Sequence, residues 1–214
     1  MPKQLTLDID NGIEQAISIL KKGGIVAFPT DTVYGLGACA EIPRAVERIY
    51  EVKERPRSMA LPLLLAEISQ IGQVSSRVPE VAWVLADRFL PGALTLVLPS
   101  ASSIPDIVTA GGKTVAVRIP AHPVPVALIK GLMTPVVGTS ANLSSRPSPL
   151  TADEVSSQLG NRIDLIIDGG KCWGSSESTI VDVTGEKPVI LRQGVISLAE
   201  LRRVCPDIIL REGN

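Results

Sequence analysis

Apolar residues recur along this chain with two spacings, and each spacing predicts its own kind of element. Between Asp10 and Leu20 they fall three or four residues apart, and Gly23-Gly24 follows them. This pattern predicts a capped amphipathic helix that starts at Asp10-Asn11 and ends at glycines that tolerate positive φ. Helical spacing or capping signals predict further helices that begin at Pro43, Pro79, Ala127, Thr151 and Ser197.

Short apolar runs between these helices predict strands, because such runs suit strands that are buried on both faces. The runs cover residues 25–28, 61–65, 94–98, 114–119, 135–140, 162–168, 178–183 and 188–192. Residues 29–42 are expected to form a loop. Since no long Pro-, Gly- or Ser-rich linker interrupts the alternation, we expect one α/β domain over residues 1–214, with helices flanking a mixed twisted sheet.

Composition narrows the class of protein. The chain has 21 Lys and Arg residues against 22 Asp and Glu residues, so its formal net charge is −1. Nucleic-acid-binding modules usually carry a clear excess of cations, and a dedicated one is therefore disfavoured. No apolar run approaches the roughly 18 residues that a membrane helix needs, and acids near the N-terminus argue against a signal peptide. We expect a soluble cytoplasmic protein.

The scarcity of cysteine and histidine excludes several kinds of site. The three cysteines are widely spaced and form no CxxC pair, so neither a disulfide framework nor structural zinc is expected. The single histidine, His122, rules out most metal sites and a Ser-His-Asp triad, and we interpret it as a turn residue. The chemistry must therefore rest on other side chains.

Two polar segments stand where loops at the edge of a sheet hold ligands. Residues 29–37, PTDTVYGLG, combine hydroxyls with two glycines, which fits a ligand loop or an ordinary turn in which Asp31 caps its own backbone. Residues 138–148, GTSANLSSRPS, place five hydroxyls, an amide and a guanidinium within eleven residues. Such a segment would suit a polar ligand that is contacted by many short hydrogen-bond donors. The alternative is that the segment is a serine-rich surface loop.

Lys53, Arg55 and Arg57 alternate just after a predicted helix, and Pro56 keeps Arg55 extended. In an extended chain, residues two apart face the same way, so the three cations are expected to converge. An oligophosphate would fit between them, since guanidinium groups match pairs of phosphate oxygens. The alternative is a solvated cluster near a helix C-terminus, where cations are favoured.

Arg118 ends an apolar run that is otherwise suited to burial. A guanidinium there is costly unless a carboxylate pairs with it, either from the protein or from a ligand. Thr114 shares its strand face, four residues and about 13 Å away. Ser178 and Arg192 hold comparable places on later strands, and each is either a ligand contact or an ordinary strand-end residue.

Taken in order, these segments resemble those of one known family. The chain contains PTDTVYGLG, VKERP, PGALTLVL, TVAVRIP, GTSANLSSRPSP, STIVD and ILRQG. Their identity and order are similar to the YrdC-domain family, over roughly residues 12–196. The resemblance implies one twisted α/β domain around a concave, positively charged cavity, in the short form without a further C-terminal domain.

The resemblance also implies an activity. Members of the family are threonylcarbamoyl-AMP synthases of tRNA modification, which combine L-threonine, bicarbonate and ATP into threonylcarbamoyl-AMP and pyrophosphate. A partner transferase then passes the threonylcarbamoyl group to tRNA, and tRNA is itself a candidate partner of this chain. The expected Mg²⁺ would be held mainly by ATP phosphates and water, with no set of protein ligands.

Matching motifs carry the family's site residues onto this sequence, where Arg118 would take the amino-acid carboxylate. The residues implied for L-threonine are Thr32, Leu64, Arg118, Gly138 and Ser178. Those implied for ATP are Lys53, Arg55, Met59, Thr114, Ser140, Ser148 and Arg192. Those implied for catalysis are Lys53, Arg55, Ser140 and Asn142.

The sequence departs from the family pattern at two positions. Met59 stands where Asn or Lys is common, and Leu64 stands where many members place a His. These changes bear on threonine selectivity and leave the phosphate-binding pattern intact. A related branch has lost the Lys-x-Arg and Ser-x-Asn signatures, and their presence here favours an active enzyme.

Two other functions stay open at this point. A module that binds double-stranded RNA or tRNA without ATP turnover would bind more weakly as salt increases. A domain that makes a carbamoyl adenylate from carbamoyl phosphate, as in hydrogenase maturation, is expected in long chains with zinc-finger cysteines, which this sequence lacks. Pyrophosphate release that depends on L-threonine would separate the synthase from both.

Overall fold

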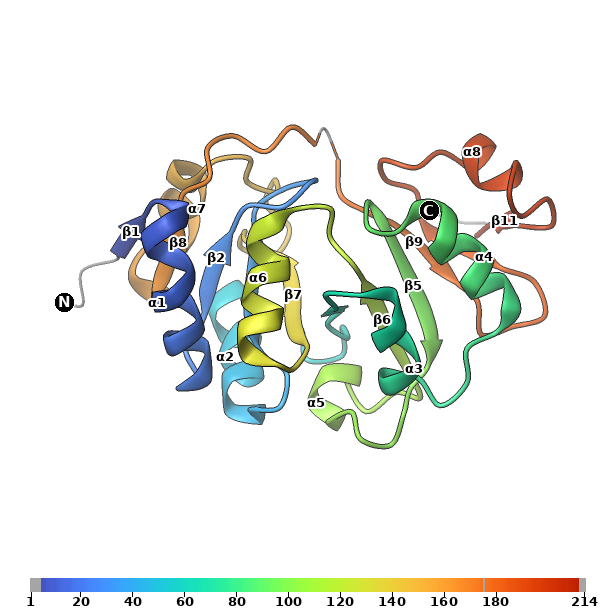
Figure 1. Cartoon of the computed structure of the whole chain (residues 1–214), viewed down its shortest axis with the longest axis horizontal. Helices are drawn as coiled ribbons and strands as arrows, with labels where there is room; N and C mark the ends of the chain where they lie inside the picture. Colours follow the sequence, from blue (N-terminus) through green and yellow to red (C-terminus); the bar gives the residue numbers. More distant parts are fainter. Residues whose placement is uncertain (1–4, 175, 212–214) are drawn as a thin grey trace.

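The structure, a computed structural model, describes residues 5–174 and 176–211 and folds them around one mixed sheet (Figure 1). Its strands are β1 (Leu5–Leu7), β2 (Val26–Phe28), β3 (Gly35–Cys39), β4 (Leu63–Leu64), β5 (Leu94–Pro99), β6 (Thr114–Arg118), β7 (Val136–Ser140), β8 (Leu165–Ile167), β9 (Thr179–Asp182), β10 (Val189–Arg192) and β11 (Ile209–Leu210). Its α-helices are α1 (Ile9–Lys21), α2 (Pro43–Lys53), α3 (Ile71–Val74), α4 (Glu80–Phe89), α5 (Asp106–Thr109), α6 (Pro123–Leu132), α7 (Ala152–Leu159) and α8 (Leu198–Arg202). Short 3₁₀ turns occupy Ile68–Gln70 and Gly160–Arg162.

The two-residue strand β4 lies at the middle of the sheet, whose order is β1-β8-β2-β3-β7-β4-β6-β5-β9-β10-β11. It pairs antiparallel with β7 and parallel with β6, although the apolar run at 61–65 predicted a longer strand. We call the strands from β1 to β7 in this order the first half, and those from β6 to β11 the second half. Parallel and antiparallel pairs occur in both halves, which confirms the predicted mixed sheet.

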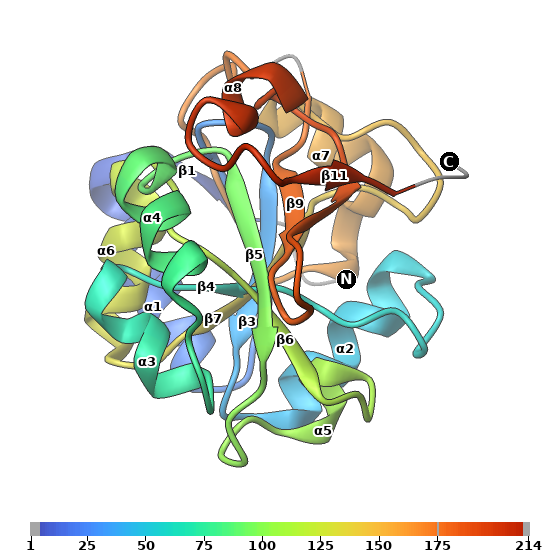
Figure 2. The same ribbon diagram turned by 90° about the vertical axis from the view of Figure 1, so that its right-hand side faces the viewer.

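Alternate residues around β2 enter two hydrophobic cores on opposite faces of the first half. Val26 and Phe28 pack in a core with residues of α1 and α6, whereas Ile25 and Ala27 belong to the core that includes residues of α2 and α7. Figure 2 shows α1 and α6 on one side of the sheet and α2 and α7 on the other. Burial on both faces explains why this strand is a continuous apolar run in the sequence.

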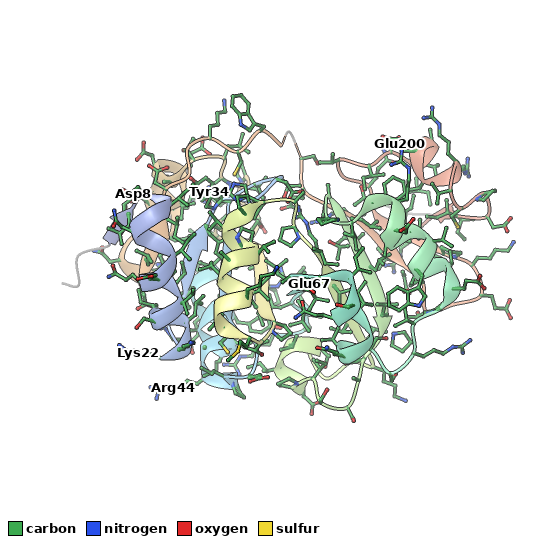
Figure 3. All side chains as sticks on the ribbon, in the orientation of Figure 1. Asp8, Lys22, Tyr34, Arg44, Glu67 and Glu200 are labelled. Atoms are coloured by element: carbon green, nitrogen blue, oxygen red, sulfur yellow. The ribbon has the colours of Figure 1, made fainter. Side chains whose placement is uncertain are left out.

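The first helix begins earlier than its sequence pattern predicts. Helix α1 starts at Ile9 rather than at Asp10-Asn11, because Asp8 is the residue that caps it. The Asp8 carboxylate accepts the Asn11 N–H at 3.0 Å, which satisfies a donor that the first turn leaves unpaired. Figure 3 labels Asp8 and Lys22 at the two ends of this helix.

Helix α6 also begins earlier than predicted, at Pro123 rather than Ala127. The His122 side chain caps it by accepting the Val124 N–H at 3.2 Å. Proline suits the first turn because the N–H that it lacks would have had no partner within the helix. His122 therefore has a structural role at the junction between β6 and α6, in agreement with its interpretation as a turn residue.

The loop expected over residues 29–42 contains an unpredicted strand, β3. Its two glycines interrupt the apolar pattern, yet packing requires both of them. A Cβ on Gly37 would lie 2.7 Å from Val136 and 2.8 Å from the Phe28 ring, and one on Gly35 would lie 3.0 Å from the same ring. Because β3 pairs with both β2 and β7, the true loop after β2 is short.

Candidate functional site

A cavity of about 570 Å³ is lined by residues from both halves of the sheet. Among the described residues, its wall carries one carboxylate, Glu177, and five cations: Lys53, Arg55, Arg118, Arg146 and Arg192. A chain with a net charge of −1 therefore concentrates positive charge in one place. This agrees with the expected concave, positively charged cavity, and the volume is in the range of small-molecule sites.

Three contacts hold Arg118 in the cavity wall. Its Nη2 donates to Asp31 Oδ1 at 2.7 Å, and its Nη1 donates to Thr32 Oγ1 at 3.0 Å. Its Nε donates to the carbonyl of Gly92 at 3.0 Å. Burial lowers the pKa of Arg118, whereas the adjacent Asp31 raises it. Since a guanidinium carries five N–H groups, these three contacts leave two that no hydrogen bond among the described residues uses.

The short loop between β2 and β3 positions Asp31 and Thr32. Thr30 Oγ1 donates to the Val33 carbonyl at 2.6 Å and accepts the Thr32 N–H at 3.1 Å, so the loop is tied to itself. Asp31 Oδ1 accepts the Ala121 N–H at 3.1 Å in addition to binding Arg118. Asp31 is thus the protein carboxylate that the buried guanidinium requires, and it bridges distant segments instead of capping its own loop.

Lys53, the last residue of α2, is only 2% exposed. Its ammonium donates to the carbonyls of Ser140 and Asn142 at 2.5 and 2.7 Å, and to Asn142 Oδ1 at 3.2 Å. Burial and, to a lesser degree, the charge of Arg55 lower the pKa of Lys53 to about 8. All three ammonium donors have protein acceptors, so Lys53 fixes the segment after β7 and adds its charge to the cavity wall.

The Asn142 side chain completes the anchoring of that segment. Its Nδ2 donates to the carbonyls of Leu143 and Arg146 at 2.9 and 2.7 Å, while its Oδ1 accepts from Lys53. Within the described part of the chain, the Ser144 hydroxyl on the cavity wall is buried with no hydrogen-bond partner. The serine-rich segment is thus an ordered part of the cavity and not a loose surface loop.

Arg55 and Arg57 diverge, which contradicts the expected convergence of three cations. Arg55 lines the cavity, and its Nε donates to the Met59 carbonyl at 3.2 Å. Arg57 lies outside the cavity wall and pairs with Glu47 at 2.5 Å. Glu54 has a positive φ of 54°, so the chain turns after α2 and does not continue as the extended segment on which the prediction rested. The surface-cluster interpretation therefore holds for Arg57.

A second polar cluster surrounds Glu177, which comes shortly before β9. Its carboxylate accepts the Ser148 hydroxyl at 2.6 Å and pairs with Arg192 Nη1. Arg192 also donates from Nε and Nη2 to the Ser178 carbonyl, at 3.2 and 3.0 Å. The Ser178 hydroxyl lies 2.8 Å from that of Thr95 on β5. These contacts fix the positions of Glu177 and Arg192 beside the hydroxyl groups of Ser148, Ser178 and Thr95.

Leu64 and Gly138 face each other on the central strands and form an apolar part of the wall. A Cβ on Gly138 would lie 2.5 Å from the Leu64 side chain, so the glycine makes room for the leucine. Leu64 itself is 6% exposed and belongs to the core shared with α1 and α6. Where a histidine is common in the family pattern, this chain therefore offers no polar contact.

The structure gathers all but two of the site residues that the family resemblance implies. Those on the cavity wall are Thr32, Lys53, Arg55, Met59, Leu64, Arg118, Gly138, Ser140, Asn142, Ser178 and Arg192. Ser148 reaches the cavity through its hydrogen bond to Glu177. Thr114 lies at the opposite end of β6 from Arg118, where it pairs with Pro99.

Outside the segments already singled out, sequence reasoning missed two polar residues of the wall, Thr95 and Glu177. It gave Asp31 no more than a turn role. Thr95 was detectable as a hydroxyl inside an apolar run, LTLVL. Glu177 precedes Ser178, but no local pattern links it to Arg192, 15 residues further along. Asp31 and Arg118 are 87 residues apart, so their pairing has no signal in local sequence.

The described residues offer no group of three or more His, Cys, Asp or Glu side chains that could hold a metal ion. All three cysteines are free thiols in buried positions. Within the same part of the chain, no helix is both long and apolar enough to cross a membrane.

Residues 18–194 match the Sua5/YciO/YrdC family model, which carries the description telomere recombination. The chain is 43% identical over 196 residues to the threonylcarbamoyl-AMP synthase of Pyrococcus abyssi, a match covering 92% of this chain and 58% of that protein. It is also 43% identical over 205 residues to the threonylcarbamoyl-AMP synthase of Bacillus subtilis, covering 95% of this chain and 59% of that protein.

The fold is similar to the crystal structure of P. abyssi Sua5 complexed with L-threonine. The TM-score is 0.92 at 40% sequence identity, and the match covers 97% of this chain and 62% of that chain. This likeness confirms the predicted α/β fold with a mixed sheet and flanking helices. In each of these matches the chain spans less than two thirds of the length of its relative.

Proposed function

Because this chain belongs to the Sua5/YciO/YrdC family, we propose that it is a threonylcarbamoyl-AMP synthase. It would form threonylcarbamoyl-AMP and pyrophosphate from L-threonine, bicarbonate and ATP. The observation that carries the proposal is a cavity whose described lining has five cations against one carboxylate, with Arg118 already neutralised by Asp31. Such a wall suits two anionic substrates that must be held side by side.

The amino acid is assigned to the region around Arg118. The two N–H groups that Arg118 does not use within the protein can take a carboxylate, and the hydroxyls of Thr32 and Ser178 also line this cavity. Gly138 and Leu64 would pack against the threonine side chain. With Leu64 apolar, recognition of that side chain rests on the neighbouring hydroxyls.

The nucleotide is assigned to the cationic part of the wall. Arg55 and Arg192 would contact phosphate oxygens directly, whereas Lys53 would act mainly by charge and by holding Ser140 and Asn142 in place. The exposed Met59 side chain leaves the contact from Arg55 intact, because that contact uses the Met59 carbonyl. The Ser148 hydroxyl donates to Glu177 here, and the roles of Ser148 and Thr114 toward ATP stay sequence predictions.

The proposed chemistry needs no protein nucleophile. Bicarbonate adds to the threonine amine to give an anionic carbamate with loss of water, and a carbamate oxygen then attacks the α-phosphorus of ATP. The new P–O bond replaces the bond to the β-phosphate, which leaves as pyrophosphate. The residues of this chain would contribute position and positive charge, which fits a wall whose described residues include no histidine or cysteine.

We propose that Mg²⁺ enters with ATP, held mainly by phosphate oxygens and water. Glu177 is the one carboxylate among the described residues of the wall, and both of its oxygens are engaged by Ser148 and Arg192. The residues present therefore fit a metal that arrives on the nucleotide better than one held by the protein. Bound Mg²⁺ would supply further neutralisation of phosphate charge.

The product would be consumed by a transferase partner that modifies tRNA, in the cytoplasm. A module that binds RNA without ATP turnover is less well supported, because the cations line one cavity of about 570 Å³, a small-molecule size, rather than an extended face.

The test is release of pyrophosphate from ATP with bicarbonate and Mg²⁺, measured with and without L-threonine, and identification of the product by mass. We expect turnover that depends on threonine and yields threonylcarbamoyl-AMP. ATP turnover indifferent to threonine, or no turnover with any divalent metal, would contradict the proposal. Binding of tRNA that weakens steeply with salt, without ATP turnover, would favour the RNA-binding alternative.

A further inference from the structure

Glu177 places a negative charge within the cationic wall that is assigned above to nucleotide phosphates. One carboxylate oxygen accepts the Ser148 hydroxyl at 2.6 Å, and the other pairs with the Arg192 guanidinium. Its charge also raises the pKa values of Lys53 and Arg55, against the lowering caused by burial. One acid therefore interacts with every cation that the nucleotide is proposed to use.

These cations repel one another where no anion lies among them. Arg55 lowers the pKa of Lys53, and Arg192 lowers those of both Arg55 and Arg118. Glu177 offsets this repulsion with two carboxylate oxygens, the same kind of acceptor that a phosphate would present. Its contacts thus resemble those of a ligand phosphate group in the sign of the charge and in the acceptor role of the oxygens.

The side chain of Glu177 can move while its backbone stays in place. The Val195 N–H donates to the Glu177 carbonyl at 3.0 Å, and Gly194 packs so closely that an added Cβ would lie 2.1 Å from that oxygen. By contrast, the Glu177 side chain is 32% exposed and can rotate toward solvent. Arg192 would keep its position after such a rotation, because Ser178 still accepts from its Nε and Nη2.

We infer that the Glu177 carboxylate is an internal substitute for nucleotide phosphate. Before the nucleotide binds, it neutralises Arg192 and orders the Ser148 hydroxyl, and phosphate oxygens replace it on both partners when the nucleotide enters. This inference rests on the proposed function, and it adds that the protein itself competes with its nucleotide. The exchange keeps the cations ordered at all times, at the expense of affinity for polyphosphate.

The test measures binding of inorganic tripolyphosphate and of ATP to the full chain by calorimetry, without divalent metal and with Mg²⁺. Glu177→Gln keeps an oxygen for Ser148 but removes the competing charge, so we expect metal-free affinity to increase about three- to tenfold. Glu177→Ala should change affinity in the same direction. Glu47→Gln is the matched control, since it removes the same charge from an arginine pair outside the cavity, and its affinity should equal that of the parent chain.

Equal or weaker metal-free binding by Glu177→Gln would overturn the inference, as would a gain seen in Glu177→Gln but not in Glu177→Ala. A loss of affinity confined to Mg²⁺ buffers would make Glu177 a metal ligand and would also overturn it. If the parent chain binds neither tripolyphosphate nor ATP, the proposed function fails together with the inference. Binding by the parent chain with no change in the variants removes the Glu177 inference alone.

Discussion

Two arginine–acid pairs in the same cavity differ in burial and in where their acid lies. In the pair of Arg118 and Asp31 the side chains are 10% and 16% exposed, and Asp31 is not among the residues that line the cavity. In the pair of Arg192 and Glu177 they are 42% and 32% exposed, and Glu177 is part of the wall.

Because the two ion pairs differ in burial, they differ in how much free energy is needed to break them. A buried ion pair is costly to break, because either charge left alone has lost its hydration. A half-exposed pair exchanges partners at little cost, because water and salt already compete with it. If Arg118 binds the amino acid as proposed, it does so as a fixed group with its counter-ion built in. Under the inference drawn for Glu177, Arg192 has a counter-ion that a ligand would displace.

Of all substitutions in these two pairs, removal of the Arg118 side chain should have the largest effect on stability and on threonine binding. Arg118→Ala leaves Asp31 without its charge partner, so we expect the free energy of unfolding to fall by about 3 kcal/mol. Threonine binding should weaken more than tenfold, while nucleotide binding changes much less. Thermal melting and two calorimetric titrations on one variant measure all three quantities.

The double variant Arg118→Ala/Asp31→Ala separates the stability effect from the binding effect. It removes both charges, and it should therefore recover much of the lost stability without recovering threonine affinity. If Arg118→Ala melts far lower yet, when folded, binds threonine as the parent chain does, then Arg118 serves the fold and not the substrate.

The next largest effect on binding is expected at Arg55, which interacts electrostatically with the pair of Arg192 and Glu177. Arg55→Ala should remove a charge-assisted contact of about 1.5–3 kcal/mol, which is roughly ten- to a hundredfold in ATP affinity. Arg55→Lys should recover part of the lost ATP affinity, because an ammonium group keeps the charge but cannot form the two parallel hydrogen bonds of a planar guanidinium. Arg57→Ala is the control outside the cavity and should bind ATP normally. Unchanged titrations for both Arg55 variants would show that Arg55 does not contact the nucleotide, although it lines the cavity.

The smallest effect concerns pH and Lys53. In the folded chain its pKa is about 8, below its ordinary value of 10.5, so between these values the folded state binds fewer protons than the unfolded state. The contribution of Lys53 to stability should therefore increase as pH rises through this range. Nucleotide affinity should change in the opposite direction and fall about three- to tenfold from pH 7.5 to 9, as a cavity cation is neutralised.

Titrations of ATP at several pH values, with Lys53→Met as control, test this prediction. The control has no charge to lose, and its ATP affinity should vary little over the same range. An equal pH dependence in both proteins would show that another group is responsible.

The sequence predicted elements well where apolar spacing was regular and poorly where packing demanded glycine. Gly35 and Gly37 conceal β3, because the ring of Phe28 occupies the space that their side chains would fill. The cationic residues of the site could be recognised in the sequence by their residue type and position. The carboxylates that pair with them could not. The fold of the sheet brings Asp31 to Arg118 and Glu177 to Arg192. The local sequence contains no pattern that predicts these pairs.

The order of strands has a consequence for the synthesis of this chain. β1 and β2 both pair with β8, which follows β2 by well over a hundred residues. At roughly 5–20 residues per second, a ribosome takes on the order of ten seconds to travel from β2 to β8. During that time β5, β6 and β7 emerge while β2 still has one edge unpaired, so the nascent chain presents an apolar strand edge that a chaperone would recognise.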